Sequence, residues 1–429
     1  MLESLTLRAV GPCSSLGPIE FGERVNLLTG DNGLGKSFLL DMAWWVFTQT
    51  WAGEQPWPRP ETNRESPPEI GANLRIRGDL GRTEWYYCFS RQRWIPRKNH
   101  TDASAAMVVH LGPNGESGIL DPAQIDWPRA LWRRLPDWEG PTPLRLSAIQ
   151  GRNGVRLDDG RTLCRGLIDD LVTWQQTNSP EFEAIQRVLT CLSPPGPERL
   201  VFGKPTRVSK DDQRLHPTLA LPYGEIPVSL ASAGMQRILL LAYLLVWAWH
   251  SHLAASKMVR RDPERSMVVL LDEPEMHLHP RWQRAILPSL LLAIDQLQGD
   301  LQVQLIVSTH SPLVLGSMEP IFDRERDKLL ELSMDEETTQ VEIYDRPWSN
   351  QGDATAWLTS DTFGLRQARS LPAEIAIDAA NRFMRGEAHA SPEHLRSKEQ
   401  IHEELLRVLG GLDPFWPRWI VATDTRLRP

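Results

Sequence analysis

The stretch Gly30–Ser37, with the sequence GDNGLGKS, constrains this chain most, because it fits the pattern G-x-x-x-x-G-K-[ST]. It follows Val25–Leu28, which reads as a strand, and precedes Phe38–Phe47, in which Asp41 is the only charged residue. Glycines allow successive backbone N–H groups to turn inward around phosphate oxygens, which a Cβ would obstruct. The stretch therefore predicts a strand, a phosphate-binding loop and a buried helix.

The residue types in this loop suit a nucleotide triphosphate and a magnesium ion. Lys36 is placed to reach the β- and γ-phosphates, and the Ser37 hydroxyl is placed to ligate Mg²⁺. We therefore expect ATP and Mg²⁺ as ligands. The predicted nucleotide-binding residues are Asp31, Asn32, Gly33, Leu34, Gly35, Lys36, Ser37 and Phe38.

Two later apolar segments also end in polar residues. Met267–Leu271 is a continuous apolar run followed by Asp272 and Glu273, and Leu301–Ser308 is followed by Thr309-His310. Parallel strands present such residues at the carboxyl edge of a sheet. We predict that Asp272 completes the Mg²⁺ shell and that Glu273 activates the attacking water. His310 is predicted to contact the γ-phosphate, so that the expected catalytic residues are Glu273, His310 and Lys36.

A third segment, Ser229–Arg237, places small residues before the apolar run Ile238–Trp249. Free N–H groups at a helix start attract anions, although small-residue turns before helices are common in proteins that bind nothing there. A metal site formed by His277, His279 and His310 is rejected, because the nearby carboxylates are needed for Mg²⁺ and no cysteine lies close in sequence.

Together these elements resemble, in order and type, the ABC-type ATPases. The Walker A motif is GDNGLGKS, the signature-like element is ASAGMQR and the Walker B motif is MVVLLDEPEMHLHP. The Walker B motif resembles the soluble SMC-like branch more than transporter ATPases. That branch includes repair ATPases and the ATPase subunits of anti-phage systems of the overcoming-lysogenization-defect-like and Septu types. The resemblance covers residues 1–50 and about 226–345. It implies a head-to-tail homodimer or higher oligomer in which the signature residues Ser232, Ala233 and Gly234 act on the ATP of a second subunit.

The chain departs from the ABC pattern at several positions. Met276–His279 stands where a transporter-like chain carries a Ser-Ala-Leu-Asp loop, and Ala233 replaces a glycine of the signature, so that only Ser232 and Gly234 are carried over as γ-phosphate contacts. Gln92 and Gln150 are both candidates for the Q-loop glutamine. Cys13–Leu16 contains no aromatic residue, which leaves adenine recognition unassigned.

The resemblance implies an α/β fold with an ABC-type P-loop head and a mixed sheet, and the chain length leaves room for a β-rich and helical insertion and a small helical appendage. The expected divisions are 1–50 with 226–345 for the ATPase core, 51–225 for the inserted lobe and 346–429 for the appendage. The insertion lacks sustained heptads, which excludes a long coiled coil. It interleaves basic and aromatic residues, which fits either a nucleic-acid contact or a solvated strand face over an aromatic core: Arg82, Trp85, Tyr86, Tyr87, Arg91, Arg93, Trp94, Arg97 and Lys98.

Bulk properties indicate a cytoplasmic protein. The net charge of −8 gives no global attraction to nucleic acid, and the four cysteines are scattered without a C-x-x-C spacing, which fits reduced thiols. The N-terminus lacks the pattern of a signal peptide, and Ile238–Trp249 is too short to span a bilayer, so no membrane partner is expected.

The resemblance favours an ATPase switch in anti-phage defence or DNA repair, working with a partner nuclease and with DNA as a further expected partner. Two other classes compete with it. One is a nucleotide-gated, DNA-sensing scaffold with negligible turnover, and the other is a transporter nucleotide-binding subunit, which Met276–His279 disfavours.

Overall fold

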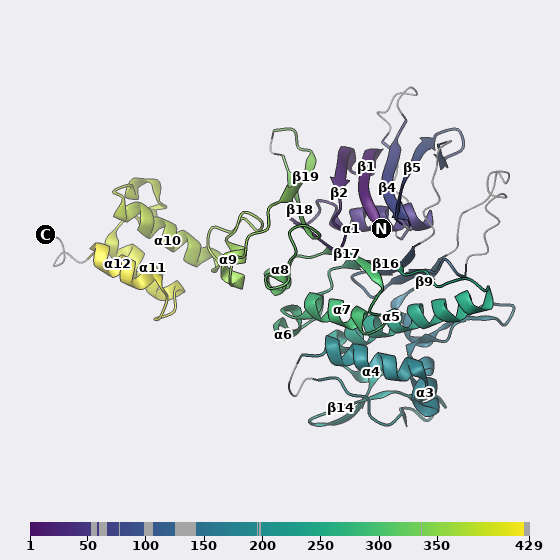
Figure 1. The fold of residues 1–429 in the computed structure, drawn as a ribbon. Coiled ribbons are helices and arrows are strands. Elements are labelled where there is room, and N and C mark those ends of the chain that lie inside the picture. Colours follow the sequence, from purple (N-terminus) through teal and green to yellow (C-terminus); the bar gives the residue numbers. More distant parts are fainter. Residues whose placement is uncertain are drawn as a thin grey trace. The chain divides into compact units, whose positions relative to one another are not determined.

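The computed structural model describes residues 1–52, 58–59, 67–76, 78–97, 106–124, 143–194, 196, 199–335 and 337–423. The chain divides into two compact units, Met1–Gly352 and Asp353–Pro429 (Figure 1). All residues of the predicted nucleotide site belong to the first unit.

An eight-stranded mixed sheet forms the centre of the first unit, in the order β19-β18-β3-β17-β16-β7-β8-β9. The five strands from β18 to β7 run parallel, and β19, β8 and β9 pair antiparallel at the two edges. The predicted mixed α/β class is therefore confirmed. The strands are β3 (Val25–Gly30), β7 (Met107–Leu111), β8 (Ser117–Leu120), β9 (Leu144–Leu146), β16 (Ser266–Asp272), β17 (Gln302–Ser308), β18 (Lys328–Met334) and β19 (Val341–Arg346).

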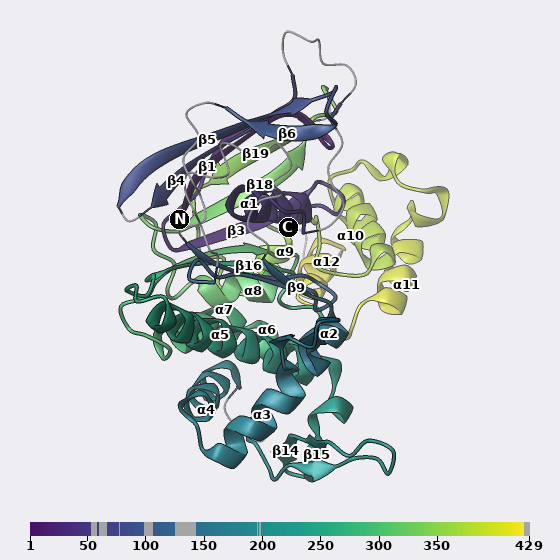
Figure 2. The same cartoon turned by 90° about the vertical axis from the view of Figure 1, so that its right-hand side faces the viewer.

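A second, antiparallel sheet has the order β2-β1-β4-β5-β6. Helix α1 (Lys36–Thr48) lies between the two sheets (Figure 2) and shares a core with both, which explains why its sequence is apolar nearly all round. Trp44 and Trp45 of α1 are buried, as predicted for this helix. The strands of this sheet are β1 (Leu2–Val10), β2 (Cys13–Glu20), β4 (Glu69–Ile76), β5 (Asp79–Cys88) and β6 (Arg93–Pro96).

Helices cover the other face of the central sheet, with α5 and α7 next to it and α3 and α4 beyond them (Figure 1). Helix α5 is the one described helix whose length and composition would allow it to cross a membrane, and 67% of its most apolar window is buried in the protein. Its predicted run Ile238–Trp249 lies within it. The helices are α2 (Ala148–Asn153), α3 (Gly166–Thr177), α4 (Pro180–Leu192), α5 (Ala233–Met258), α6 (Pro280–Gln283), α7 (Ile286–Asp295) and α8 (Pro312–Met318).

The range 51–225 does not form a separate inserted lobe. Strand β4 pairs with β1, and β7 pairs in parallel with β16, so the first half of this range builds both sheets of the core. Only the second half forms a helical lobe, with α2 to α4 and the short strands β10 (Val155–Arg156), β11 (Thr162–Cys164), β12 (Thr206–Arg207), β13 (Leu215–His216), β14 (Thr218–Leu221) and β15 (Gly224–Pro227). Backbone hydrogen bonds between segments distant in sequence determine which part of this range joins the core. Local sequence patterns do not predict such bonds.

The basic and aromatic residues of this range lie largely on β5 and β6. Trp85 is buried in the core, whereas Arg82 and Arg97 form ion pairs with Glu84 and Glu69. This arrangement is that of a solvated strand face over an aromatic core, and Lys98 lies outside the described residues. The cysteines Cys88, Cys164 and Cys191 are free thiols.

The second unit is a small helical domain with its own core. Ile377, Ile401, Leu405 and Trp419 are among its buried residues, and Arg369 forms an ion pair of 2.9 Å with Asp413. Its helices are α9 (Ala354–Leu358), α10 (Leu371–Met384), α11 (Lys398–Val408) and α12 (Phe415–Thr423).

Candidate nucleotide-binding site at the carboxyl edge of the sheet

The predicted phosphate loop connects the end of β3 to the start of α1. Gly30, Gly33 and Gly35 all have positive φ, the conformation that glycine adopts without strain. At Gly30 a Cβ would lie 2.2 Å from the carbonyl oxygen of Leu332 on β18, so this position also requires glycine for space. The loop is therefore built from the conformations and the close backbone approach that the glycine spacing predicts.

Lys36 lies inside the curve of this loop. Its Nζ donates hydrogen bonds of 2.8 Å to the carbonyl oxygens of Gly30 and Asp31. Burial lowers the pKa of Lys36, and the charges of Glu273 and Asp272 oppose that change. The lysine and the two carboxylates are thus close enough to interact electrostatically, as the sequence predicts for one shared site.

The remaining predicted loop residues divide into two groups. Asp31, Asn32, Gly33 and Ser37 are exposed, whereas Leu34 and Phe38 are half-buried and pack against the core between the sheets. The structure thus presents Ser37 to solvent beside Lys36 and uses the two apolar residues to anchor the loop.

The predicted carboxylates follow β16, which pairs in parallel with β17 up to Asp272 and Ser308. The Ser308 hydroxyl donates a hydrogen bond to Asp272 Oδ1, and the backbone N–H of Glu273 donates to the carbonyl oxygen of Ser308 at 3.1 Å. Glu273 has a φ of 46°, a left-handed conformation that is strained for a residue with a Cβ. Strand pairing and this backbone conformation together set the direction of the Glu273 side chain.

His310 lies beside Glu273. Its Nε2 is 3.6 Å from Glu273 Oε1, and both side chains are about one-third exposed. Burial, followed by the positive charge of Lys36, lowers the pKa of His310, so the imidazole is neutral at pH 7. The predicted base and the predicted γ-phosphate contact are therefore neighbours at one edge of the sheet.

Glu275 is a site residue that the sequence analysis missed, although it stands within the quoted DEPE motif. Its Oε1 accepts hydrogen bonds from Thr309 Oγ1 at 2.7 Å and from the backbone N–H of His310 at 2.8 Å. Burial raises the pKa of Glu275, and these hydrogen bonds oppose the increase. The carboxylate fixes the segment that carries His310.

The signature residues lie at the start of α5. Ser232 is the N-cap and its hydroxyl accepts a hydrogen bond from Met235 N at 3.3 Å. At Gly234 a Cβ would lie 2.7 Å from the carbonyl oxygen of His277, so the helix start packs against the segment that follows Glu273. Within the described residues, no hydrogen bond or ion pair joins 232–234 to the phosphate loop of the same chain.

Arg237 is the second residue that the sequence analysis did not assign. It is 7% exposed, and its guanidinium donates to four backbone carbonyls. Nη2 donates to Asp272 at 2.9 Å and Glu273 at 3.0 Å, and Nη1 donates to Gly112 at 3.3 Å and Pro113 at 2.6 Å. The first turn of the signature helix is thereby connected to the end of β16 and to the β7–β8 turn.

The donor set fits a magnesium ion. Asp272 offers a carboxylate of which Ser308 engages Oδ1, and the exposed Ser37 hydroxyl supplies a second hard oxygen. Mg²⁺ prefers such oxygen ligands and is usually held by one or two carboxylates together with substrate phosphates. The described residues contain no group of three or more His, Cys, Asp or Glu side chains arranged for a metal.

Other sequence candidates lie outside this arrangement. Gln150 forms the capping box of α2, where its Oε1 accepts from Ser147 N at 2.9 Å, and Gln92 lies in the β5–β6 turn. Within the described part of the chain, neither glutamine is hydrogen-bonded to residues 30–38 or 272–273. The Q-loop assignment therefore stays open.

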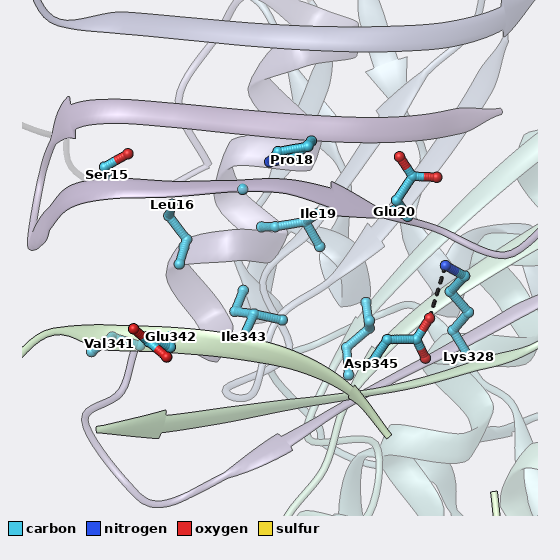
Figure 3. Close-up of a pocket in the computed structure, with 12 residues that line it drawn as sticks. Ser15, Leu16, Pro18, Ile19, Glu20, Lys328, Val341, Glu342, Ile343 and Asp345 are labelled. Atoms are coloured by element: carbon cyan, nitrogen blue, oxygen red, sulfur yellow. Dashed lines mark ion pairs between the residues drawn. The ribbon is translucent and has the colours of Figure 1, made fainter. Parts of the chain in front are cut away.

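A separate cavity of about 340 Å³ lies between β2 and the β18–β19 hairpin (Figure 3). Leu16, Ile19 and Ile343 line it, and Lys328 forms a 3.0 Å ion pair with Asp345 at its border. It contains none of the predicted catalytic residues. Ser15 and Leu16 belong to its lining. The residue that contacts the adenine base stays unassigned.

The central parallel strands present the phosphate loop, Asp272, Glu273 and His310 at their carboxyl edge, and α5 begins with the signature-like residues. This arrangement agrees with the resemblance to SMC-like ATPases that the motifs indicate. Family comparison agrees with this class. Residues 221–316 match the model of a family described as "AAA domain, putative AbiEii toxin, Type IV TA system".

Individual relatives are similar over parts of the chain. A segment of 51 residues is 46% identical to the retron Vc95 probable ATPase of Vibrio cholerae serotype O1 biovar El Tor, and it covers 12% of this chain and 9% of that protein. The chain thus aligns with less than a tenth of the relative's length.

Two solved structures are similar over 81% of this chain. The SMC head domain from Thermotoga maritima is 15% identical, with 99% of that chain covered and a TM-score of 0.40. An SMC head bound to the C-winged helix domain of ScpA is 16% identical, with 98% of that chain covered and a TM-score of 0.44.

Proposed function

We propose that this protein is a cytoplasmic, Mg²⁺-dependent ATPase that works as a head-to-tail dimer. The observation that carries the proposal is the convergence of Lys36, Asp272, Glu273 and His310 at one sheet edge, with Glu273 Oε1 3.6 Å from His310 Nε2. Of the signature residues, Gly234 packs against the carbonyl of His277 of its own chain, which suits action of the signature on the nucleotide of another copy.

In the proposed reaction each residue has a defined task. Lys36 neutralises charge on the β- and γ-phosphates, and Glu273 orients and deprotonates the attacking water. Neutral His310 donates a hydrogen bond to the γ-phosphate, while Glu275 keeps its backbone in position. Ser37 and Asp272 would hold a bound Mg²⁺, which would supply charge stabilisation for the transferring phosphoryl group.

ATP acts as a bridge between the two copies in this proposal. Ser232 and Gly234 of one copy close on the γ-phosphate held by the other, and hydrolysis removes the bridging group, so the population shifts from closed to open dimers. The biological setting we propose is anti-phage defence with a partner nuclease. It rests on the motif resemblance and on the similarity to the retron Vc95 probable ATPase.

The first test measures ATP turnover and oligomer mass with Mg²⁺, in the presence and absence of DNA. Glu273→Gln should bind ATP, remain dimeric in its presence and lose turnover by about 100-fold or more, since the general base is absent. Tight ATP binding with negligible turnover in the wild type would replace the proposed enzyme with a nucleotide-gated scaffold.

The second test asks whether the site is shared between copies. Ser232→Arg and Lys36→Ala should each be inactive, and mixing them should restore part of the activity, because one of the two composite sites is then intact. Continued inactivity under conditions in which subunits are shown to exchange would contradict the head-to-tail arrangement.

A further inference from the structure

We propose that Arg237 couples the two ATP sites of the dimer, by connecting the signature helix of each chain to Glu273 of that same chain. This inference rests on the proposed head-to-tail function. Arg237 acts in it as a positioning residue that holds the backbone of the base.

The geometry places Arg237 between the two elements. It lies one turn into α5, whose N-cap is Ser232, and its Nη2 donates to the carbonyl oxygens of both Asp272 and Glu273. Gly234 on the same turn packs against the carbonyl of His277. A displacement of the helix start must therefore move the backbone on both sides of the catalytic carboxylate or break these contacts.

The surroundings of Arg237 indicate a role that packing alone does not explain. The side chain is buried, no ion pair to it exists within the described residues, and its Nε has no hydrogen-bond partner there. Burying a guanidinium is costly. The nearby carboxylates of Glu275, Asp272 and Glu273 favour its charge, and the four backbone carbonyls supply its hydrogen bonds only while they keep their positions. The bonds therefore make the end of β16 sensitive to the position of α5.

Space for movement exists beside this contact. A cavity of about 260 Å³ borders the first turns of α5, lined mainly by apolar side chains that include Ala148, Ile149 and Leu240. The helix start is thus packed incompletely on that side, and Arg237 supplies its polar attachment to β16 and to the β7–β8 turn. Free volume beside a packed helix start leaves room for a small shift of that helix.

In the head-to-tail arrangement, the contact of Arg237 with the end of β16 connects the two ATP sites of the dimer. Ser232 and Gly234 of one chain contact the ATP bound to the partner, whereas Glu273 of the same chain serves its own ATP. When the signature of one chain closes on the partner's nucleotide, Arg237 of that chain positions Glu273 at the chain's own nucleotide. Hydrolysis should therefore depend cooperatively on ATP concentration.

The test compares full-length wild type with Arg237→Met, Arg237→Lys and the control Lys257→Ala, an exposed residue near the end of the same helix. We expect Arg237→Met to retain ATP affinity within about threefold, to lose about 10- to 100-fold in kcat, and to change the Hill coefficient from above 1 to about 1. Arg237→Lys should recover part of the kcat and of the cooperativity, and Lys257→Ala should match wild type in both. Thermal melting identifies a variant that fails to fold.

Mixed dimers locate the effect. In a mixture of Ser232→Arg with Lys36→Ala, the active composite site takes Glu273 from the Ser232→Arg chain. Adding Arg237→Met to that chain should lower the recovered activity by about 10- to 100-fold, whereas adding it to the Lys36→Ala chain should leave most of it.

Three results would each overturn the coupling. They are the reverse pattern in the mixed dimers, a Hill coefficient unchanged by Arg237→Met, and a wild type whose hydrolysis is not cooperative. Wild type without turnover, or without ATP-dependent dimers, would instead refute the proposed function. The two failures are therefore distinguishable.

Discussion

Asp41 lies on α1, one turn beyond Ser37, and replacing it with asparagine should stabilise the protein at neutral pH. Burial, together with the negative charge of Asp272, raises the pKa of Asp41 to about 6 from the ordinary 3.8. The folded protein therefore holds the proton of Asp41 more tightly than the unfolded chain does. An ionised Asp41 costs folding free energy, and asparagine removes that charge while keeping the shape.

The pKa difference sets the size and the pH range of the effect. Each pKa unit corresponds to about 1.4 kcal/mol, so the ionised carboxylate costs about 2–3 kcal/mol, the lower figure allowing for the half-buried position of the side chain. Below about pH 3 the group is protonated in both states and the cost vanishes. The cost grows as pH rises from about 4 to 6 and is constant above that range.

The assay is urea unfolding of wild type and Asp41→Asn at pH 5 and pH 8, followed through the transition of the first unit. We expect asparagine to raise the free energy of unfolding by about 2–3 kcal/mol at pH 8 and by about half as much at pH 5. The exposed Asp262→Asn is the control and should change little at either pH. A gain that is equal at both values, or a loss at pH 8, would refute the assignment of a buried carboxyl beside Asp272.

Three further outcomes are expected. Glu275→Gln should lower kcat about 10- to 100-fold and keep ATP affinity, because the carboxylate that holds Thr309 and the His310 backbone is weakened; an equal loss of ATP affinity would contradict this role. Because the pKa of His310 is lowered, the acid limb of the ATPase pH profile should have its midpoint below 6.5, and a midpoint above 6.5 argues against a neutral imidazole. Leu405→Ala should destabilise the second unit by about 2–5 kcal/mol and leave the transition of the first unit unchanged in calorimetry, which a shift of both transitions would disprove.

Local sequence patterns predicted many elements of the fold. The apolar runs Met107–Leu111 and Ser117–Leu120 form β7 and β8, and the turn residues Pro113–Gly115 connect them. The strands β18 and β19 likewise form a hairpin of two segments close in sequence. Such elements are readable because turn residues and apolar runs act on neighbouring backbone, whatever surrounds them.

Contacts between segments distant in sequence cannot be predicted from such local patterns. Residues 51–225 were expected as an inserted lobe, yet β7 occupies a place in the central sheet beside β16. Helix α5 extends from Ala233 to Met258, well beyond the apolar run at its centre, because tertiary packing supports its more polar ends.

By itself the sequence determined the chemistry available to this protein. Glycine spacing defined the phosphate loop, and apolar runs ending in acidic or histidine residues defined what a parallel sheet presents at its carboxyl edge. Only the tertiary structure decided how those groups are held. Glu275 fixes the His310 segment and Arg237 connects α5 to Glu273. Both contacts join residues more than 30 positions apart, and which partners a buried charge finds depends on packing that no local pattern encodes.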